Sequence, residues 1–204
     1  MSYVRAAGKF APTALYDPLV ALTMREGAWR PQLVAHAGTG DVVEVGCGTG
    51  TLAIALAEAG ARVVGVDGDE DVLARAKAKA GGRTVDWRRG LAGELPLPDA
   101  SADVVVMSLL LHHLVPDDKA AALAEARRVL RSHGRLLIAD WGRPADPIQR
   151  VLFAGLQLAD GVENTCDHAA GRLADILLAA GFQPTLLDRL RTAWGTLEVI
   201  EAAA

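Results

Sequence analysis

The sequence VVEVGCGTG at residues 42–50 decides the fold, because an apolar run meets an acidic residue and then breaks into three glycines at alternate positions. This pattern predicts a buried strand that feeds a tight turn, in which no side chain stands between the backbone and a ligand. The next ten residues, TLAIALAEAG, space their apolar side chains as a helix does, and Gly60 is placed to end it. Strand, glycine turn and helix together predict a nucleotide-binding cradle.

A second apolar run, ARVVGVD, ends in Asp67, which follows Gly46 by 21 residues. That spacing is typical of the acidic residue that accepts hydrogen bonds from ribose hydroxyls in dinucleotide-binding units. The glycines do not follow G-x-G-x-x-G, however, because the third comes one place early and Thr51 stands where it would fall. Glu44, just before the turn, would repel a pyrophosphate and attract an ammonium group. The turn therefore favours a cationic adenosyl ligand.

These two motifs closely resemble the first two cofactor motifs of class I S-adenosylmethionine-dependent methyltransferases. Three further stretches resemble, in the same order, the group similar to ubiquinone and menaquinone C-methyltransferases (methyltransferase type 11). They are ALYDPLVALTMREGAWR at residues 14–30, ELPLPDASADVVVMSLLLHHL at 94–114 and AEARRVLRSHGRLLIADWG at 124–142. The resemblance covers nearly the whole chain. It implies an enzyme that transfers a methyl group from S-adenosylmethionine to a small organic acceptor.

The alternation of strand and helix patterns predicts an α/β fold. We expect a Rossmann-like, doubly wound, mostly parallel seven-stranded sheet with an antiparallel edge strand, in a single domain with a helical lid. The expected segments are an N-terminal helical lid segment (1–38), a cofactor-binding core (39–143), a helical lid insertion (144–181) and a C-terminal strand pair (182–204). Expected strands are 42–45, 62–66, 84–87, 102–108, 135–140, 182–189 and 193–201. Expected helices are 16–37, interrupted at Pro31, then 50–59, 70–80, 116–131, 147–160 and 168–180.

Ligands of such folds bind at the carboxyl ends of the parallel strands, so residues there are the candidates for cofactor binding. From that rule and the resemblance we predict a cofactor site made of Glu44, Gly46, Cys47, Gly48, Thr49, Gly50, Asp67, Gly68, Leu91, Ala92, Met107, Ser108 and His113. Two of these have simpler interpretations. Asp67 could cap the helix that starts near Glu70, and Cys47 could be a small packed residue, since nothing nearby in the sequence would lower its pKa.

The chain departs from the family pattern at Leu91, where relatives carry an acidic or amide residue that receives the adenine amino group. The backbone N–H groups of Leu91 and Ala92 could still reach the ring, or Asp86 could substitute from the third strand. An unpaired polar edge in a dry pocket costs about 1–3 kcal/mol, so this position affects cofactor affinity.

Methyl transfer from a sulfonium needs little acid or base when the acceptor is already nucleophilic, and alignment supplies most of the rate. A phenol, enol or alcohol would gain from a general base. The candidates are His113, the first choice, followed by His112, Asp140 and Tyr16. The histidine pair could instead cap the turn between strand and helix.

Composition agrees with an ordinary cytoplasmic enzyme. The chain has 204 residues, 51% hydrophobic content, two cysteines and a net charge of −4, with no basic block. These features predict a small-molecule substrate, no nucleic-acid partner, no stable membrane insertion and no metal site. They do not decide the oligomeric state. Two alternative functions are an NAD(P)-dependent oxidoreductase and a non-catalytic S-adenosylmethionine-binding protein. The sequence has no Tyr-x-x-x-Lys catalytic pair, which argues against the oxidoreductase.

Overall fold

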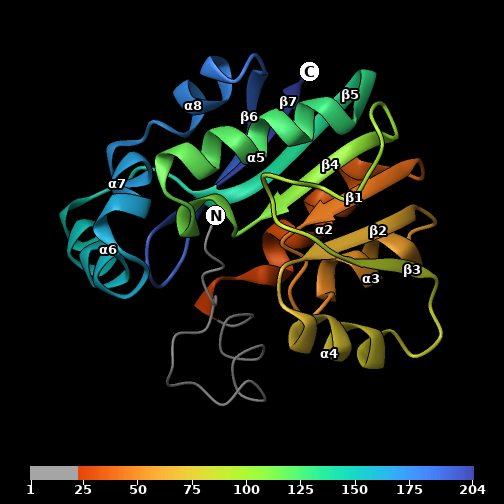
Figure 1. The fold of residues 1–204 in the computed structure, drawn as a ribbon. Coiled ribbons are helices and arrows are strands. Elements are labelled where there is room, and N and C mark those ends of the chain that lie inside the picture. The colour runs from red at the N-terminus through yellow and green to blue at the C-terminus, as the bar shows by residue number, and fades with distance from the viewer. Residues whose placement is uncertain (1–22) are drawn as a thin grey trace.

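A computed structural model describes residues 23–204 and contains one seven-stranded sheet, ordered β3-β2-β1-β4-β5-β7-β6 (Figure 1). Strands β1 to β5 are parallel, and β7 pairs antiparallel with both β5 and β6 at one edge. The strands are β1 (Asp41–Val45), β2 (Arg62–Asp67), β3 (Val85–Arg89), β4 (Ala102–Ser108), β5 (Leu130–Trp141), β6 (Gln183–Arg191) and β7 (Thr196–Ala203). The predicted doubly wound α/β fold is confirmed.

Helices cover both faces of this sheet (Figure 1). They are α2 (Glu26–Ala37), α3 (Thr51–Glu58), α4 (Glu70–Ala80), the 3-10 helix η1 (Leu111–His113), α5 (Pro116–Val129), α6 (Pro147–Asp160), α7 (Val162–Ala170) and α8 (Leu173–Ala179). Strand β4 shows how the two layers form. Val105 and Met107 join the core beneath α5 and α8, whereas Val104 and Val106 join the core beneath α2 and α3. Successive side chains of a strand point to opposite faces, so a continuous apolar run serves both cores.

Several predicted elements have different bounds in the structure. The fifth strand begins at Leu130, well before the expected residue 135, so α5 ends at Val129. The expected helix 168–180 is two helices, because Gly171 adopts a left-handed φ of 74° and ends α7. Residues 161–167, which lie between two of the expected helices, mostly form α7.

The N-terminal helix prediction is tested only in part. Pro31 lies inside α2 and does not interrupt it. A proline at the sixth position of the helix removes one intrahelical hydrogen bond, to the Gly27 carbonyl, and the helix continues for six residues beyond it. The predicted residues 16–22, with the candidate base Tyr16, lie outside the described residues.

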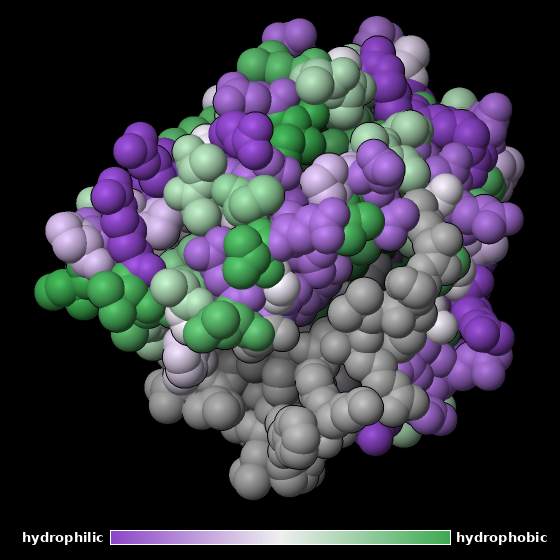
Figure 2. All heavy atoms as spheres, turned by 60° about the vertical axis from the view of Figure 1, so that its left-hand side comes forward, coloured by the Kyte–Doolittle hydropathy of each residue, from purple (hydrophilic) through white to green (hydrophobic). Residues whose placement is uncertain are grey.

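Helix α6 presents apolar side chains to solvent. The most exposed large apolar residues on it and at the start of α7 are Ile148, Val151, Leu158 and Val162. Figure 2 brings forward the side of the molecule that carries α6 and shows apolar residues lying among polar ones. Within residues 23–204, none of the helices has the length and apolar character needed to span a bilayer.

Candidate cofactor and acceptor site

The glycine turn lies where β1 ends, and backbone hydrogen bonds join it to β2. The amides of Gly46 and Cys47 both donate to the Val66 carbonyl, at 2.8 and 3.0 Å, which joins the turn to β2. Gly46, Gly48 and Gly50 all have positive φ, between 53° and 76°. A Cβ added at Gly46 would lie 2.8 Å from Leu110, whereas one at Gly48 would meet nothing within 4 Å. The Gly48 side of the turn is therefore open for close approach of a ligand.

Glu44 stands immediately before this turn and is only 2% exposed. One of its carboxylate oxygens lies 3.5 Å from the Ser108 hydroxyl, and the other, Oε2, has no hydrogen-bond partner among the described residues. Burial raises the pKa of Glu44 to about 8, although the nearby Arg30 guanidinium lowers it. A buried, unpartnered carboxylate oxygen is a position prepared for a cationic or hydrogen-bond-donating ligand.

We expect Glu44→Gln to raise the melting temperature of the ligand-free protein above pH 7. The folded-state pKa of Glu44 lies above its unfolded value, so the carboxyl contributes most to stability at acid pH and that contribution is lost as the pH rises toward about 8. A glutamine does not ionise and avoids this loss. Melting curves at pH 8.5 should show a gain of at least about 3 °C, with little difference at pH 4.5. An equal shift at both pH values would contradict a buried, proton-binding Glu44.

Asp67, at the end of β2, holds the glycine turn. Its Oδ2 accepts the Gly48 N–H at 2.9 Å, and its Oδ1 accepts the Asp69 N–H at 3.0 Å. The helix that follows is capped by Asp69, whose carboxylate accepts the amides of Asp71 and Val72. The alternative role for Asp67 as a helix cap is therefore wrong. Burial raises the pKa of Asp67, while its backbone hydrogen bonds lower it.

The loop after β3 forms a compact turn. The Glu94 N–H donates to the Leu91 carbonyl at 3.0 Å, and a Cβ at Gly90 would lie 2.5 Å from Pro96, so this glycine permits close packing of the loop. Asp86 does not supply the carboxylate missing at Leu91. It lies in the middle of β3, is exposed and pairs with Arg88 at 2.7 Å.

The other predicted cofactor residues at these strand ends differ in how far they are buried. Cys47 is buried, and burial raises the pKa of its thiol, which removes it as a nucleophile. The side chain of Met107 lies fully buried in the core, so a contact with a cofactor would involve its main chain. Thr49, Gly68 and Ala92 are each partly exposed.

A second polar cluster lies at the ends of β4 and β5. Asp140 is fully buried and accepts three hydrogen bonds, from the amides of Leu111 and Trp141 at 2.8 and 2.7 Å and from His112 Nδ1 at 2.7 Å. Burial alone would raise the pKa of Asp140, but His112 and these hydrogen bonds hold it well below its usual range. Burial lowers the pKa of His113 to about 3. Asp140 and His113 are therefore poor general bases, although both were candidates.

The structure adds residues to this cluster that the sequence did not indicate. Asp160, at the end of α6, lies 3.9 Å from His112 Nε2 and 3.7 Å from His113 Nδ1. His168, on α7, is fully buried 3.8 Å from Asp140, and neither of its ring nitrogens has a hydrogen-bond partner among the described residues. These residues come from α6 and α7, so only the folding of these two helices against η1 brings them to the strand ends.

A buried lysine and an asparagine fasten the lid insertion to the core. Lys119 of α5, 1% exposed, donates to the Asn164 carbonyl at 2.5 Å and lies 3.5 Å from Asp167. The side chain of Asn164 donates to the carbonyls of His113 at 3.1 Å and Asp160 at 2.9 Å. Residues 161–167 thus mostly form a helix because their polar groups find buried partners.

Fold and site define a Rossmann-like protein with a cradle for a cationic adenosyl ligand. The family model of the methyltransferase domain matches residues 43–138. An uncharacterized methyltransferase of Synechocystis is 31% identical over 166 residues, which cover 80% of this chain and 75% of that protein. The chain belongs to the S-adenosylmethionine-dependent methyltransferases, as the resemblance implied, and S-adenosylmethionine is the cofactor of this family.

Two further relatives and one solved structure agree. A probable S-adenosylmethionine-dependent methyltransferase of Mycolicibacterium smegmatis is 37% identical over 74% of this chain and 56% of its own length. A ubiquinone/menaquinone biosynthesis C-methyltransferase of Desulfotalea psychrophila is 34% identical over 59% of this chain and 50% of its own. This chain therefore spans about half the length of these two relatives. The crystal structure of YcgJ from Bacillus subtilis shares the fold, with a TM-score of 0.72, 18% identity, and coverage of 87% of this chain and 98% of that one.

Proposed function

We propose that this protein transfers a methyl group from S-adenosylmethionine to a small organic acceptor. The observation that carries the proposal is the buried Glu44 carboxylate, whose Oε2 has no partner among the described residues and lies beside a turn of bare backbone. A buried polar atom without a partner costs about 1–3 kcal/mol. A ligand ammonium group offsets that cost, and a dinucleotide pyrophosphate does not.

Each part of the cradle has a separate task. Glu44 binds the amino group of the methionine portion, and the open side of Gly48 lets the nucleoside approach the backbone. Asp67 accepts hydrogen bonds from the ribose hydroxyls while it keeps the turn in place. The main chain of Leu91 and Ala92 receives the adenine edge, with the Leu91 side chain packed against the ring. Ser108 orients the Glu44 carboxylate, as their 3.5 Å separation indicates.

The reaction places few demands on acid–base chemistry. When bound, S-adenosylmethionine supplies a methyl group attached to a positively charged sulfur. The task of the protein is to align the acceptor with that group and to exclude water. We assign the acceptor side to the ends of β4 and β5, where His112 and His113 lie, and we assign the covering lid to residues 144–181.

Binding of three nucleotides to the full chain tests the proposal. Isothermal titration calorimetry should show one S-adenosylhomocysteine per chain with a Kd of about 1–100 µM, a weaker or similar Kd for S-adenosylmethionine, and no heat with NAD. Binding of NAD without binding of either adenosyl ligand would overturn the proposal and favour an oxidoreductase. Transfer of label from methyl-tritiated S-adenosylmethionine to a panel of phenols, quinols and amines separates an enzyme from a protein that only binds the cofactor.

A further inference from the structure

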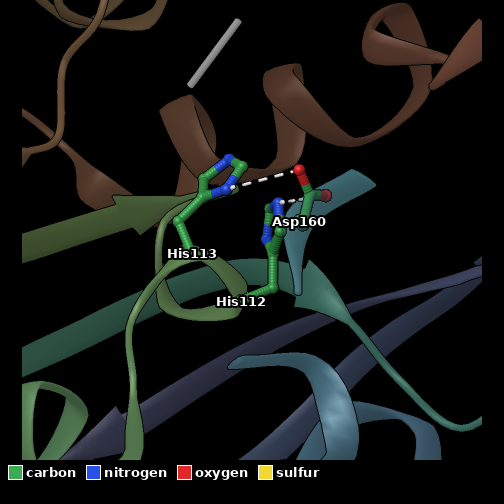
Figure 3. Close-up of side chains that lie close together, drawn as sticks. All are labelled: His112, His113 and Asp160. Atoms are coloured by element: carbon green, nitrogen blue, oxygen red, sulfur yellow. Dashed lines mark ion pairs between the residues drawn. The ribbon is translucent and has the colours of Figure 1, made fainter. Parts of the chain in front are cut away.

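We propose that His112, His113 and Asp160 form a binding site for a divalent transition-metal ion of the zinc type. Figure 3 shows the two imidazole rings turned toward the Asp160 carboxylate, with dashed lines marking the ion pairs that join Asp160 to His112 and to His113. One ligand atom from each of the three residues lies within 4.8 Å of the other two. Two imidazole nitrogens and one carboxylate oxygen are a donor set that zinc and neighbouring divalent metals accept.

The distances suit an ion better than direct hydrogen bonds. His112 Nε2 lies 3.9 Å and His113 Nδ1 lies 3.7 Å from oxygens of Asp160. Both separations exceed the hydrogen-bond range. Four ligands at about 2.0–2.1 Å from a tetrahedral zinc lie about 3.4 Å apart. A small movement of the Asp160 side chain therefore closes the site around an ion, whereas without one Asp160 forms no hydrogen bond to either imidazole.

The orientation of His112 is already fixed for metal binding. Both oxygens of Asp140 accept backbone N–H groups, so the matching tautomer of His112 carries its proton on Nδ1, 2.7 Å from the carboxylate, and its lone pair on Nε2. Asp140 is held in turn by the amides of Leu111 and Trp141. A carboxylate that orients a histidine ligand through its second nitrogen is the usual outer partner of zinc-bound imidazole.

The two segments that carry the ligands are held together independently of any ion. The Asn164 side chain donates to the carbonyls of both His113 and Asp160, which joins η1 to the end of α6. His168, whose Nε2 lies 3.8 Å from the Asp140 oxygen that His112 also contacts, adds a fully buried imidazole with no hydrogen-bond partner among the described residues. Unpartnered donors and acceptors thus gather in one buried region, which indicates a polar ligand there.

Three protein ligands leave a fourth position open, as in catalytic rather than structural zinc sites. If the proposed methyl transfer is correct, that position would hold an oxygen or nitrogen of the acceptor, because the cluster lies at the strand ends next to Glu44. A bound metal would lower the pKa of an acceptor hydroxyl and replace a protein base. The metal site itself does not depend on the proposed function, but this role does.

Metal binding can be measured on the full, untagged chain after dialysis against EDTA. Calorimetric titration with Zn²⁺ should give one ion per chain with a Kd below about 1 µM, and Co²⁺ should give visible absorption bands of a four- or five-coordinate site. His113→Ala and Asp160→Asn should each weaken Zn²⁺ binding at least about tenfold. The matched control is His36→Ala, because His36 forms an exposed pair with Glu201 at 3.3 Å and should not affect the affinity.

The outcomes separate this inference from the proposed function. Circular dichroism and titration with S-adenosylhomocysteine on the same variants show whether fold and cofactor site are intact. No Zn²⁺ uptake by the wild type, or wild-type affinity in both variants, overturns the metal site. Zn²⁺ binding without S-adenosylhomocysteine binding leaves the metal site standing and overturns the methyltransferase proposal.

Discussion

Asp67→Ala is expected to weaken binding of S-adenosylhomocysteine at least about tenfold, since a charge-assisted hydrogen bond contributes about 1.5–3 kcal/mol. The substitution removes the carboxylate proposed to bind the ribose. It also removes the acceptor of the Gly48 N–H, at 2.9 Å, so the turn loses the contact that holds its open side toward the ligand. Calorimetry at constant pH and salt measures the affinity, and Asp67→Asn should retain part of it.

Asp69→Ala is the matched control for this experiment. Asp69 is also acidic, lies two residues away, and caps α4 through the amides of Asp71 and Val72. Its loss should lower stability by about 1 kcal/mol without changing affinity. Equal affinities for Asp67→Ala and the wild type, or equal losses for the two variants, would remove the ribose role from Asp67.

Local signals explain which elements could be predicted from the sequence. The bounds of β4, α4 and α6 agree with expectation because each has a strong local cause. A nearly continuous apolar run forms β4, Asp69 caps the start of α4, Gly81 ends it, and Pro147 begins α6. The glycine turn was also predictable, since backbone with positive φ favours glycine. Asp67 was predictable because it follows Gly46 at the spacing typical of a ribose-binding acidic residue.

The lid could not be predicted at the same level, because its stability depends on distant polar partners. Helix α7 buries Thr165, Asp167 and His168, which carry no apolar periodicity, and Lys119 of α5 supplies a buried contact to its backbone. A sequence pattern records apolar periodicity and caps, but not a lysine 45 residues away. Helix propensity and apolar periodicity therefore underestimate the stability of a helix such as α7.

The acceptor side of the site was predicted only in part. His112, His113 and Asp140 were candidates from the sequence, but the burial of His113 and the hydrogen bonds of Asp140, which make both poor general bases, could not be predicted from it. Asp160 had no signal, because its place beside the histidines depends on how Asn164 fastens α6 to η1. Charged residues that come together only through tertiary packing have no characteristic spacing in the sequence, so their proximity cannot be predicted from it.

Asp140→Ala is expected to cause the largest loss of stability of any single substitution at the site. It leaves the amides of Leu111 and Trp141 and the ring of His112 without their acceptor, in a region that is fully buried. Removing one partner from a buried charged network costs about 3–5 kcal/mol. For a chain of this length that corresponds to a fall in melting temperature of about 10 °C.

Two comparisons decide whether the loss comes from this network. Asp86→Ala removes an exposed carboxylate paired with Arg88 and should shift the melting temperature by less than about 2 °C. Asp140→Asn keeps the shape and one acceptor oxygen but presents an amide donor to the remaining groups, so it should fall between the two. Asp140 accepts amides that follow β4 and end β5. The same variants therefore measure how much the polar residues of the proposed acceptor site contribute to the stability of the fold. A shift for Asp140→Ala no larger than that for Asp86→Ala would mean that water or His168 satisfies the three donors instead.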